Sequence, residues 1–522
     1  MAKIKESKDF KRRKRDKGDE PDDDDDDDAW GMYKKSQPLP GQLENCELCD
    51  KRFTVTAYSK TGPDGGLLCT KCSKEHEAQR KKDEKPKKQA GSKEKRRETQ
   101  SKLLDGIVQT GSKTLQDLCI EKVANNIHEV DEFGDLPPSL LHQLSRILSR
   151  KRVITPRTLD LFLRPDLDTL DLYDCGKLEV EDYIKIFSVV PNIKNLNLRN
   201  AGQFKDDVLD YMLERNVPLQ NIQLEAANLI SDEKWRALFE KIGDGLESLK
   251  LAWLDYSMDD ETFAHLVRSC PNLKRLKLKK CFRLGDPTLT ALCSLKSLQH
   301  LSLRFPQPTS APALATLISS LGPNLLTLSL ENFEEADDSF LAAIHSSCSR
   351  LEKLRFSEND YCTDAAFASL FTHWQNPPLV FCDLASNRSI DYTQPDGPEH
   401  DPIGLASVGF EALMMHSGSR LEMLDISSCR HISYSSLATV FDGETQYPNL
   451  RDINISFLTK VDTAIVAGLF RSCKALCKVT AFGCFNVVGA VVPKGVAVIG
   501  VPNAQDAIVR EGGLAGEAEQ IL

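Results

Sequence analysis

Apolar residues recur in one fixed arrangement along most of the chain, from residue 160 to residue 485. The arrangement is Leu-x-x-Leu-x-Leu, in which other aliphatic or aromatic residues replace some leucines, and it occurs twelve times. Its first positions are Leu167, Ile193, Leu219, Leu246, Leu273, Leu298, Leu325, Leu351, Leu379, Leu421, Leu450 and Leu476. Successive first positions lie 26, 26, 27, 27, 25, 27, 26, 28, 42, 29 and 26 residues apart. Because apolar and polar positions alternate within each copy, the pattern predicts one short strand in each unit.

A period of this length is typical of leucine-rich repeats. In several units Cys or Asn follows three residues after the strand's last apolar position, as in repeats of the cysteine type. These residues are Cys175, Cys281, Asn359, Asn387, Cys429 and Cys484. One unit is too small to bury its own apolar face, so neighbouring units must stack, with strands inside the curve and helices outside. The expected fold class is therefore α/β, a leucine-rich-repeat solenoid of about 12 repeats over residues 160–485.

The polar positions of the strands are expected to form the solenoid's binding surface, together with the loops that follow them. Across the repeats these positions are Asp171, Asn197, Gln223, Lys250, Lys277, Ser302, Ser329, Arg355, Asp383, Asp425 and Asn454. Their charges are mixed, which argues against a continuous track for phosphate groups. A local basic group, Lys274, Arg275, Lys277, Lys279 and Lys280, either contacts DNA or is simply solvated.

Two segments depart from the repeat. The 42-residue spacing marks an insertion over residues 389–406, which is rich in Pro and Gly and is expected to be a solvated loop. After Cys484 the periodicity fades, and residues 486–522 are expected to form an irregular C-terminal cap or tail.

A helical segment over residues 105–155 precedes the repeats. Leu115, Cys119, Val123 and Ile127 are spaced by four, which predicts one apolar stripe on a helix that Thr114 caps. Residues 135–138 break this pattern, and a second amphipathic helix begins near Leu140. Such helices can cover the first apolar face of a solenoid, or they can present a stripe to a partner.

Residues 46–78 contain two pairs of cysteines with the spacing of a structural zinc site. Cys46 and Cys49 form one C-x-x-C pair, Cys69 and Cys72 form the other, and 19 residues separate the pairs. Each tight turn presents two sulfurs to one tetrahedral ion, and four thiolates leave no open position for catalysis. A redox C-x-x-C is the alternative.

The remaining N-terminal segments are highly charged. Residues 1–45 have few apolar residues and are expected to be a disordered tail. A nuclear import signal is predicted at Lys11, Arg12, Arg13, Lys14 and Arg15, and a run of seven aspartates follows at Asp22–Asp28. The linker at residues 79–104 carries 11 basic and four acidic residues between Arg80 and Lys102. It is either a flexible spacer or a sequence-indifferent nucleic-acid contact through Lys81, Lys82, Lys85, Lys87, Lys88, Arg96 and Arg97.

Composition narrows the class of protein further. The 522 residues are 41% hydrophobic and 28% charged, which excludes wholesale disorder and a collagen-like chain. The net charge of −10 argues against coating nucleic acid with the whole surface. Neither a signal peptide nor a membrane span is expected, and the 16 cysteines are expected to be mostly buried thiols in a reducing compartment. No phosphate-binding loop or catalytic constellation is apparent, so a noncatalytic protein is expected.

The order of these modules resembles the fungal Rad-seven family of nucleotide excision repair proteins. Its most specific element is the zinc segment CELCDKRFTVTAYSK with DGGLLCTKC, and the positions Thr114, Leu115, Cys119 and Val123 are similar to the elongin-C-binding box of ubiquitin-ligase receptors. The pair Leu136 and Pro137 is similar to the short element that such receptors place against a cullin. The resemblance implies a nuclear subunit of global-genome repair that acts with a Swi/Snf-type DNA-dependent ATPase on damaged duplex DNA or chromatin. It also implies a receptor role in an elongin C and cullin ubiquitin ligase.

Three alternatives stay open from the sequence. One is a DNA-binding scaffold for the ATPase without a ligase role, which would bind in a strongly salt-dependent way and independently of Leu115. Another is an F-box-like receptor, since Leu136 to Leu148 can be read as an F-box opening. A third is a leucine-rich-repeat regulator of a small GTPase.

Overall fold

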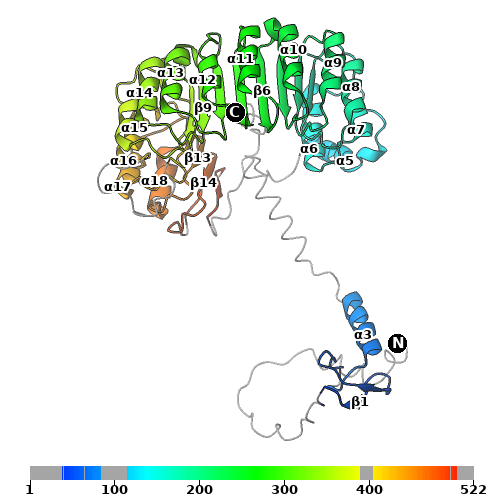
Figure 1. Cartoon of the computed structure of the whole chain (residues 1–522). Coiled ribbons are helices and arrows are strands. Elements are labelled where there is room, and N and C mark those ends of the chain that lie inside the picture. Colours follow the sequence, from blue (N-terminus) through cyan, green and yellow to red (C-terminus); the bar gives the residue numbers. More distant parts are fainter. Residues whose placement is uncertain are drawn as a thin grey trace. The chain divides into compact units, whose positions relative to one another are not determined.

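A computed structural model describes residues 38, 40–63, 65–83, 114–387, 404–488, 490–493 and 495–501, with the side chains of residues 77–83 left out. The chain divides into two compact units, residues 1–95 and 96–522. Figure 1 colours the elements along the sequence. The import signal, Lys85 to Arg97, most of the 389–406 insertion and residues 502–522 lie outside the described residues.

The N-terminal unit contains a short hairpin and one helix. Strand β1 (Leu43–Asn45) pairs antiparallel with β2 (Arg52–Thr54), and α3 spans Thr70–Asp83. Its small core consists of buried Cys46, Leu68 and Cys72, against which Leu48 and Phe53 pack. Helix α3 therefore continues past residue 78, where the linker was predicted to begin, and it includes Lys81 and Lys82.

The second unit is the predicted solenoid, in which thirteen strands form one parallel sheet in chain order. The strands are β3 (Thr169–Leu172), β4 (Asn195–Leu198), β5 (Asn221–Glu225), β6 (Ser248–Leu254), β7 (Arg275–Cys281), β8 (His300–Arg304), β9 (Thr327–Glu331), β10 (Lys353–Ser357), β11 (Phe381–Asp383), β12 (Met423–Asp425), β13 (Asp452–Asn454), β14 (Lys478–Thr480) and β15 (Ala497–Ile499). Each of the first twelve begins two residues after a predicted first position. Strand β15 lies where an irregular segment was expected, and it pairs with β14 through Ala497 opposite Lys478.

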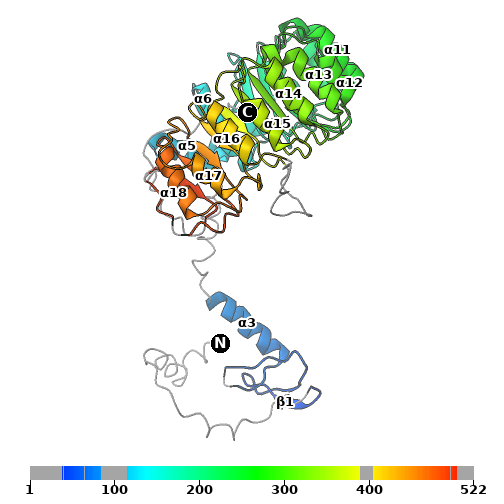
Figure 2. The same ribbon diagram turned by 90° about the vertical axis from the view of Figure 1, so that its left-hand side faces the viewer.

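Helices line the outer side of the sheet. Two of them, α5 (Leu115–Asn125) and α6 (Pro138–Arg150), precede β3, with the 3-10 turn η2 (Ile127–Glu129) between them. The others are α7 (Pro156–Asp160), α8 (Val180–Val189), α9 (Asp206–Glu214), α10 (Asp232–Ile242), α11 (Asp260–Ser269), α12 (Asp286–Leu292), α13 (Ala311–Leu321), α14 (Asp338–Ser347), α15 (Asp364–Phe371), α16 (Ser407–Ser417), α17 (Tyr434–Val440) and α18 (Thr463–Ser472), with 3-10 turns η3 (Gly243–Gly245) and η4 (Gly322–Asn324). Figures 1 and 2 show helices α11 to α15 side by side in chain order on the outside of the strands.

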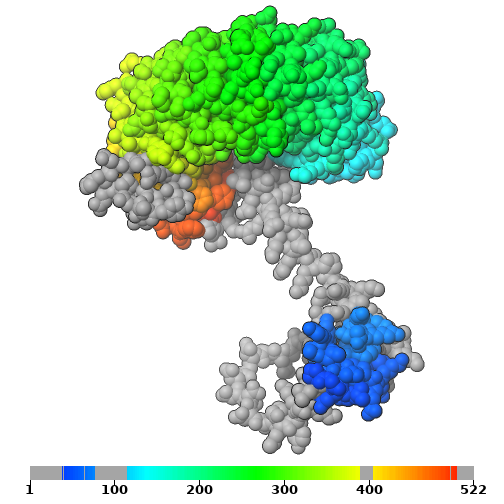
Figure 3. All heavy atoms as spheres, in the orientation of Figure 1, coloured from blue at the N-terminus to red at the C-terminus, as the bar shows by residue number. Residues whose placement is uncertain are grey.

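One continuous apolar core joins the repeats from Ile120 to Val501. Along the strands, residues alternate between buried and half-buried, so one side of each strand packs on the helices and the other faces the inside of the curve. The predicted Cys and Asn positions are also buried. Asn359 accepts a hydrogen bond from the Phe333 N–H at 3.0 Å and donates to Asn387 Oδ1 at 3.2 Å, so its amide satisfies polar groups between repeats. In the space-filling view the repeats follow one another along a continuous surface (Figure 3).

Helix starts are tied to the following repeat by aspartates. Asp232 Oδ1 accepts from the Met258 N–H at 2.7 Å, and Asp260 Oδ1 accepts from the Gly285 N–H at 3.1 Å. Asp364 has the same role across the 42-residue spacing between repeats. Its carboxylate accepts from the N–H groups of Ala406, Val408 and Gly409 at 2.8, 3.0 and 2.8 Å. Within the described ranges, no helix is both long and apolar enough to cross a membrane.

Candidate functional site

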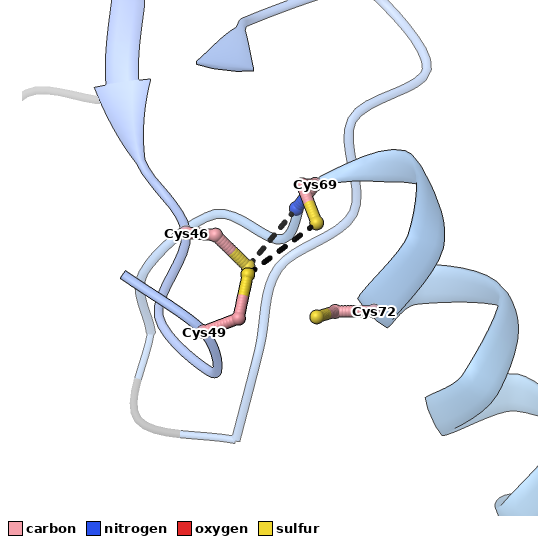
Figure 4. A group of neighbouring side chains, drawn as sticks. All are labelled: Cys46, Cys49, Cys69 and Cys72. Carbon is pink, nitrogen blue, oxygen red and sulfur yellow. Dashed lines mark hydrogen bonds between the residues drawn. The ribbon is translucent and has the colours of Figure 1, made fainter. Parts of the chain in front are cut away.

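The four predicted zinc ligands lie together in the N-terminal unit. Cys46 and Cys49 lie in the turn between β1 and β2, and Cys69 and Cys72 lie at the start of α3. Their sulfurs all lie within 4.8 Å of one another, and those of Cys49 and Cys69 are 3.8 Å apart. Tetrahedral coordination with Zn–S bonds of about 2.3 Å puts neighbouring sulfurs about 3.8 Å apart. Figure 4 shows the four thiols pointing toward one another, as a single ion requires.

Backbone groups around the cysteines prepare the site for thiolates. Burial acts to raise the pKa of the Cys46 thiol, but backbone N–H groups, among them that of Cys69 at 3.2 Å, outweigh it and lower the pKa to about 6. Burial and the neighbouring cysteines raise the pKa of Cys72. A divalent cation would offset the repulsion among four thiolates. The turn residue Gly65 has φ +91°, a left-handed conformation that glycine adopts without steric cost.

Helix α5 carries the predicted partner-binding stripe. The Thr114 hydroxyl oxygen accepts from the Asp117 N–H at 3.1 Å and so caps the helix as predicted. Leu115 is 79% exposed and Cys119 is also exposed, whereas Val123 is half-buried. Ile127, predicted on the same stripe, is instead buried in η2. The four-residue stripe is therefore wrong at its last position, because the helix ends at Asn125 and the chain turns into the core.

The opposite face of α5 packs against the rest of the unit. Ile120, Ala124 and Ile127 belong to the continuous core. Leu118, which the spacing by four did not single out, is 49% exposed. It lies three residues after Leu115 and one before Cys119, so the exposed apolar face of α5 consists of Leu115, Leu118 and Cys119. A search for spacing by three as well as four would have included it.

The predicted Leu136 and Pro137 pair precedes α6 and is held by Arg164. The Arg164 guanidinium donates to the carbonyl oxygens of Gly134 at 3.0 Å and Leu136 at 3.5 Å. Leu136 packs partly against the core, while Pro137 is exposed at the start of α6. Two hydrogen bonds from Arg164 therefore hold the segment that leads into α6, and only Pro137 of the pair is fully available to a partner.

The predicted nucleic-acid residues fall at the edge of the described ranges. Lys81 and Lys82 lie in the last turn of α3, and Lys85, Lys87, Lys88, Arg96 and Arg97 lie beyond it. In the basic group of the solenoid, Lys274 pairs with Glu247 at 2.9 Å and Lys279 pairs with Glu331 at 3.1 Å. Lys280 lies over the Trp253 ring at 3.7 Å.

Comparison with known proteins agrees with this arrangement. A family model described as the "DNA repair protein rhp7 treble clef domain" matches residues 40–78. The protein "DNA repair protein rhp7" of Schizosaccharomyces pombe is 26% identical over 442 residues, which cover 84% of this chain and 74% of that protein. "DNA repair protein RAD7" of Saccharomyces cerevisiae is 23% identical over 414 residues, covering 74% of this chain and 69% of that one.

A solved structure has the same fold as the described repeats. A crystal structure titled as a complex of Rad7 and Elc1 in yeast matches with a TM-score of 0.59 and 20% identity, covering 75% of this chain and 99% of that chain. With the treble-clef match, the cysteine cluster is a structural zinc site. The zinc module matches the treble-clef model and the similarity extends over most of the chain, so this chain is similar to the DNA repair proteins Rhp7 and RAD7.

Proposed function

We propose that this protein is a noncatalytic receptor and scaffold subunit in nucleotide excision repair, and that α5 binds an elongin C. The observation that carries the proposal is the two-sided character of α5. Ile120 and Ala124 fix the helix to the solenoid, while Leu115, Leu118 and Cys119 face outward. Large apolar side chains exposed together on one rigid element are typical of a protein interface. The related proteins named for DNA repair and the complex of Rad7 with Elc1 support the same role.

The chemistry of this face suits a helix that docks closely. A leucine supplies an apolar anchor for a pocket, and a cysteine is small enough for two backbones to approach. The N-terminal turn of α5 is capped by Thr114, so the anchor is held on a formed helix before the partner arrives. Such preorganisation reduces the entropy cost of binding.

Binding of the full-length chain to purified elongin C tests the proposal. The double variant Leu115→Ala, Cys119→Phe removes the anchor and blocks close approach, and we expect affinity to fall by about 100-fold or more. A matched control, Val408→Ala with Met415→Ala, removes exposed apolar side chains of α16 and should bind normally. If the wild type fails to bind, or if both double variants bind equally well, elongin C is not the partner of α5.

The finer assignments extend this proposal. We infer that a cullin contacts the segment at Leu136 and Pro137, and that the protein acts with a Swi/Snf-type ATPase on damaged duplex DNA or chromatin in the nucleus, to which Lys11–Arg15 direct it. The acidic net charge of −10 restricts any DNA contact to local basic segments such as Lys81 and Lys82. DNA binding that falls steeply with salt and survives the Leu115→Ala change would favour the scaffold role instead.

A further inference from the structure

Three cations gather on the inner face of strands β6 and β7. The register places Lys250 of β6 directly opposite Lys277 of β7. Arg275 lies two residues before Lys277 and therefore on the same face of its strand. Neighbouring strands lie about 4.8 Å apart, so these side chains form one compact basic cluster, Lys250, Arg275 and Lys277.

This basic cluster forms no salt bridge within the described part of the chain, although Asp171 and Glu331 lie near enough to attract Lys250 and Lys277. All three side chains are half-buried, and no carboxylate of the described residues pairs with them. Burial, together with Lys279 and Lys250, lowers the pKa of Lys277 to about 8, and burial also lowers the pKa of Lys250. Partly desolvated positive charge of this kind destabilises the free protein and favours a bound anion.

Cations on the neighbouring strands form ion pairs, unlike Lys250, Arg275 and Lys277. Arg304 donates to Glu331 at 3.0 Å and to Glu358 at 2.7 Å. Arg355 pairs with Asp383 at 2.6 Å. The inner face thus pairs its cations over β8 to β11, and Lys279 of β7 with Glu331, whereas Lys250, Arg275 and Lys277 form no ion pair among the described residues.

An aromatic hollow lies where these strands end. It encloses about 200 Å³ and is lined by Trp253, Lys280, Phe282, Arg304, Phe305 and Asn332, together with Pro306. Trp253 is 45% exposed and Phe282 is 40% exposed. The Lys280 ammonium lies 3.7 Å from the centre of the Trp253 ring, which holds the indole in place by a cation–π contact. The volume is sufficient for one apolar side chain.

The backbone conformation at Trp253 recurs in other repeats. Its φ of +59° lies in the left-handed region, as it does for Asn200, Lys280 and Phe457 at the equivalent position of other repeats. The repeat therefore imposes this conformation on residues of different types. What Trp253 contributes to the hollow is its aromatic side chain, which is 45% exposed and lies against Lys280.

Charges elsewhere on the inner face indicate the length and class of the ligand. The row that contains Lys250 and Lys277 continues to Asp171 on one side and to Asp383 and Asp425 on the other. Duplex DNA carries a charge about every 1.7 Å and would meet these carboxylates if it followed the curve. A short peptide needs to cover only β6 and β7, and it can carry both acidic and apolar side chains.

We propose that the inner face of β6 and β7 binds a short acidic peptide segment of a partner protein, with its carboxylates on Lys250, Arg275 and Lys277 and one apolar side chain in the hollow beside Trp253 and Phe282. The inference rests on the proposed receptor role and names the chemistry of what the solenoid would receive. It does not depend on which protein contacts α5.

The test uses the full chain and a fluorescein-labelled peptide of alternating Asp and Glu with one central Phe, measured by fluorescence polarisation. The double variant Lys250→Gln, Lys277→Gln should weaken binding by about 10- to 100-fold, as expected for the loss of charged hydrogen bonds. The double variant Lys185→Gln, Lys241→Gln removes two exposed lysines of α8 and α10 and should leave affinity unchanged. The Trp253→Ala variant should lose the preference for this peptide over one with central Gly.

Two further measurements distinguish this inference from the proposed binding of elongin C. The Lys250→Gln, Lys277→Gln variant should bind elongin C normally, and the Leu115→Ala, Cys119→Phe variant should bind the peptide normally. Either proposal can therefore fail while the other holds. Equal binding of an Asn and Gln version of the peptide would overturn the inference. The inference would also be overturned if duplex DNA bound through Lys250 and Lys277 and the acidic peptide did not displace it.

Discussion

At the scale of single residues, Lys277 is a charged side chain at a repeat position where the fold needs only a small polar one. The position of Lys277 equals that of Ser302 and Ser329 in the next two repeats, so a small polar residue satisfies the fold there. A lysine at this position is half-buried beside Lys250 and Lys279. Stability is therefore lower than the fold allows, as is common at binding sites.

We predict that Lys277→Met stabilises the protein by about 1 kcal/mol at pH 7. The pKa of Lys277 is lowered from the ordinary 10.5 to about 8, so between these values the unfolded chain binds more protons than the folded one. The stability of the wild type should therefore rise with pH over this window, and the advantage of the variant should shrink toward pH 10.5.

Urea unfolding of both proteins at pH 7 and pH 10 measures this difference. The Lys185→Met variant, which removes an exposed ion pair with Asp160, is the control and should show little change at either pH. A constant difference between wild type and Lys277→Met at the two pH values would contradict the assignment of the effect to the charge of Lys277.

At the scale of elements, repeats are joined by side chains that satisfy the first N–H groups of the following unit. Asp364 is the most demanding case, since it is buried and accepts three backbone hydrogen bonds from residues on the far side of the longest spacing. Loss of this carboxylate would leave buried donors without partners, which costs more than the bonds contribute.

We predict that Asp364→Ala lowers the free energy of unfolding by about 3 kcal/mol. Amide hydrogen exchange should show the largest loss of protection in α15 and α16, because repeats contact mainly their neighbours. Asp360→Ala, at an exposed position close by, should change stability by less than about 0.5 kcal/mol. Comparable losses in both variants would show that the Asp364 bonds do not hold these repeats together.

Twelve of the strands could be predicted from the sequence, whereas β15 and two surface features could not. The twelve strands were predictable because stacking forces the same apolar pattern on each repeat. Strand β15 was not, because Ala497–Ile499 repeats only part of that pattern and gains its place by pairing with β14. The zinc ligands followed from spacing alone, whereas Leu118 and the hollow beside Trp253 depend on which side of a helix or loop faces outward.

At the scale of the whole molecule, two units depend on different sources of stability. The N-terminal unit has a core of only a few residues, so its zinc ion must supply much of its folding energy. The repeat unit has a continuous apolar core and contains cysteines that are mostly buried thiols. The units should therefore respond separately to loss of metal.

We predict that a zinc chelator, or the change Cys69→Ser, unfolds residues 46–78 and leaves the unfolding midpoint of the repeats unchanged. Metal content by mass spectrometry and hydrogen exchange across the full chain report both effects. Cys119→Ser, an exposed cysteine outside the cluster, should retain the metal. Unchanged metal content after Cys69→Ser would refute the zinc assignment, and a shifted midpoint of the repeats would refute the independence of the units.

Strands β11 and β12 pair in direct register, Phe381 opposite Met423, although their spacing along the chain is the longest between neighbouring strands of the repeats. The geometry of the sheet is therefore insensitive to chain length between Asn387 and Gly404, since longer connections cost little extra entropy. This insensitivity makes the segment a practical attachment point. A fluorescent protein or affinity handle inserted there would report the molecule's whereabouts in living cells while both termini, α5 and the inner face of β6 and β7 stay unaltered.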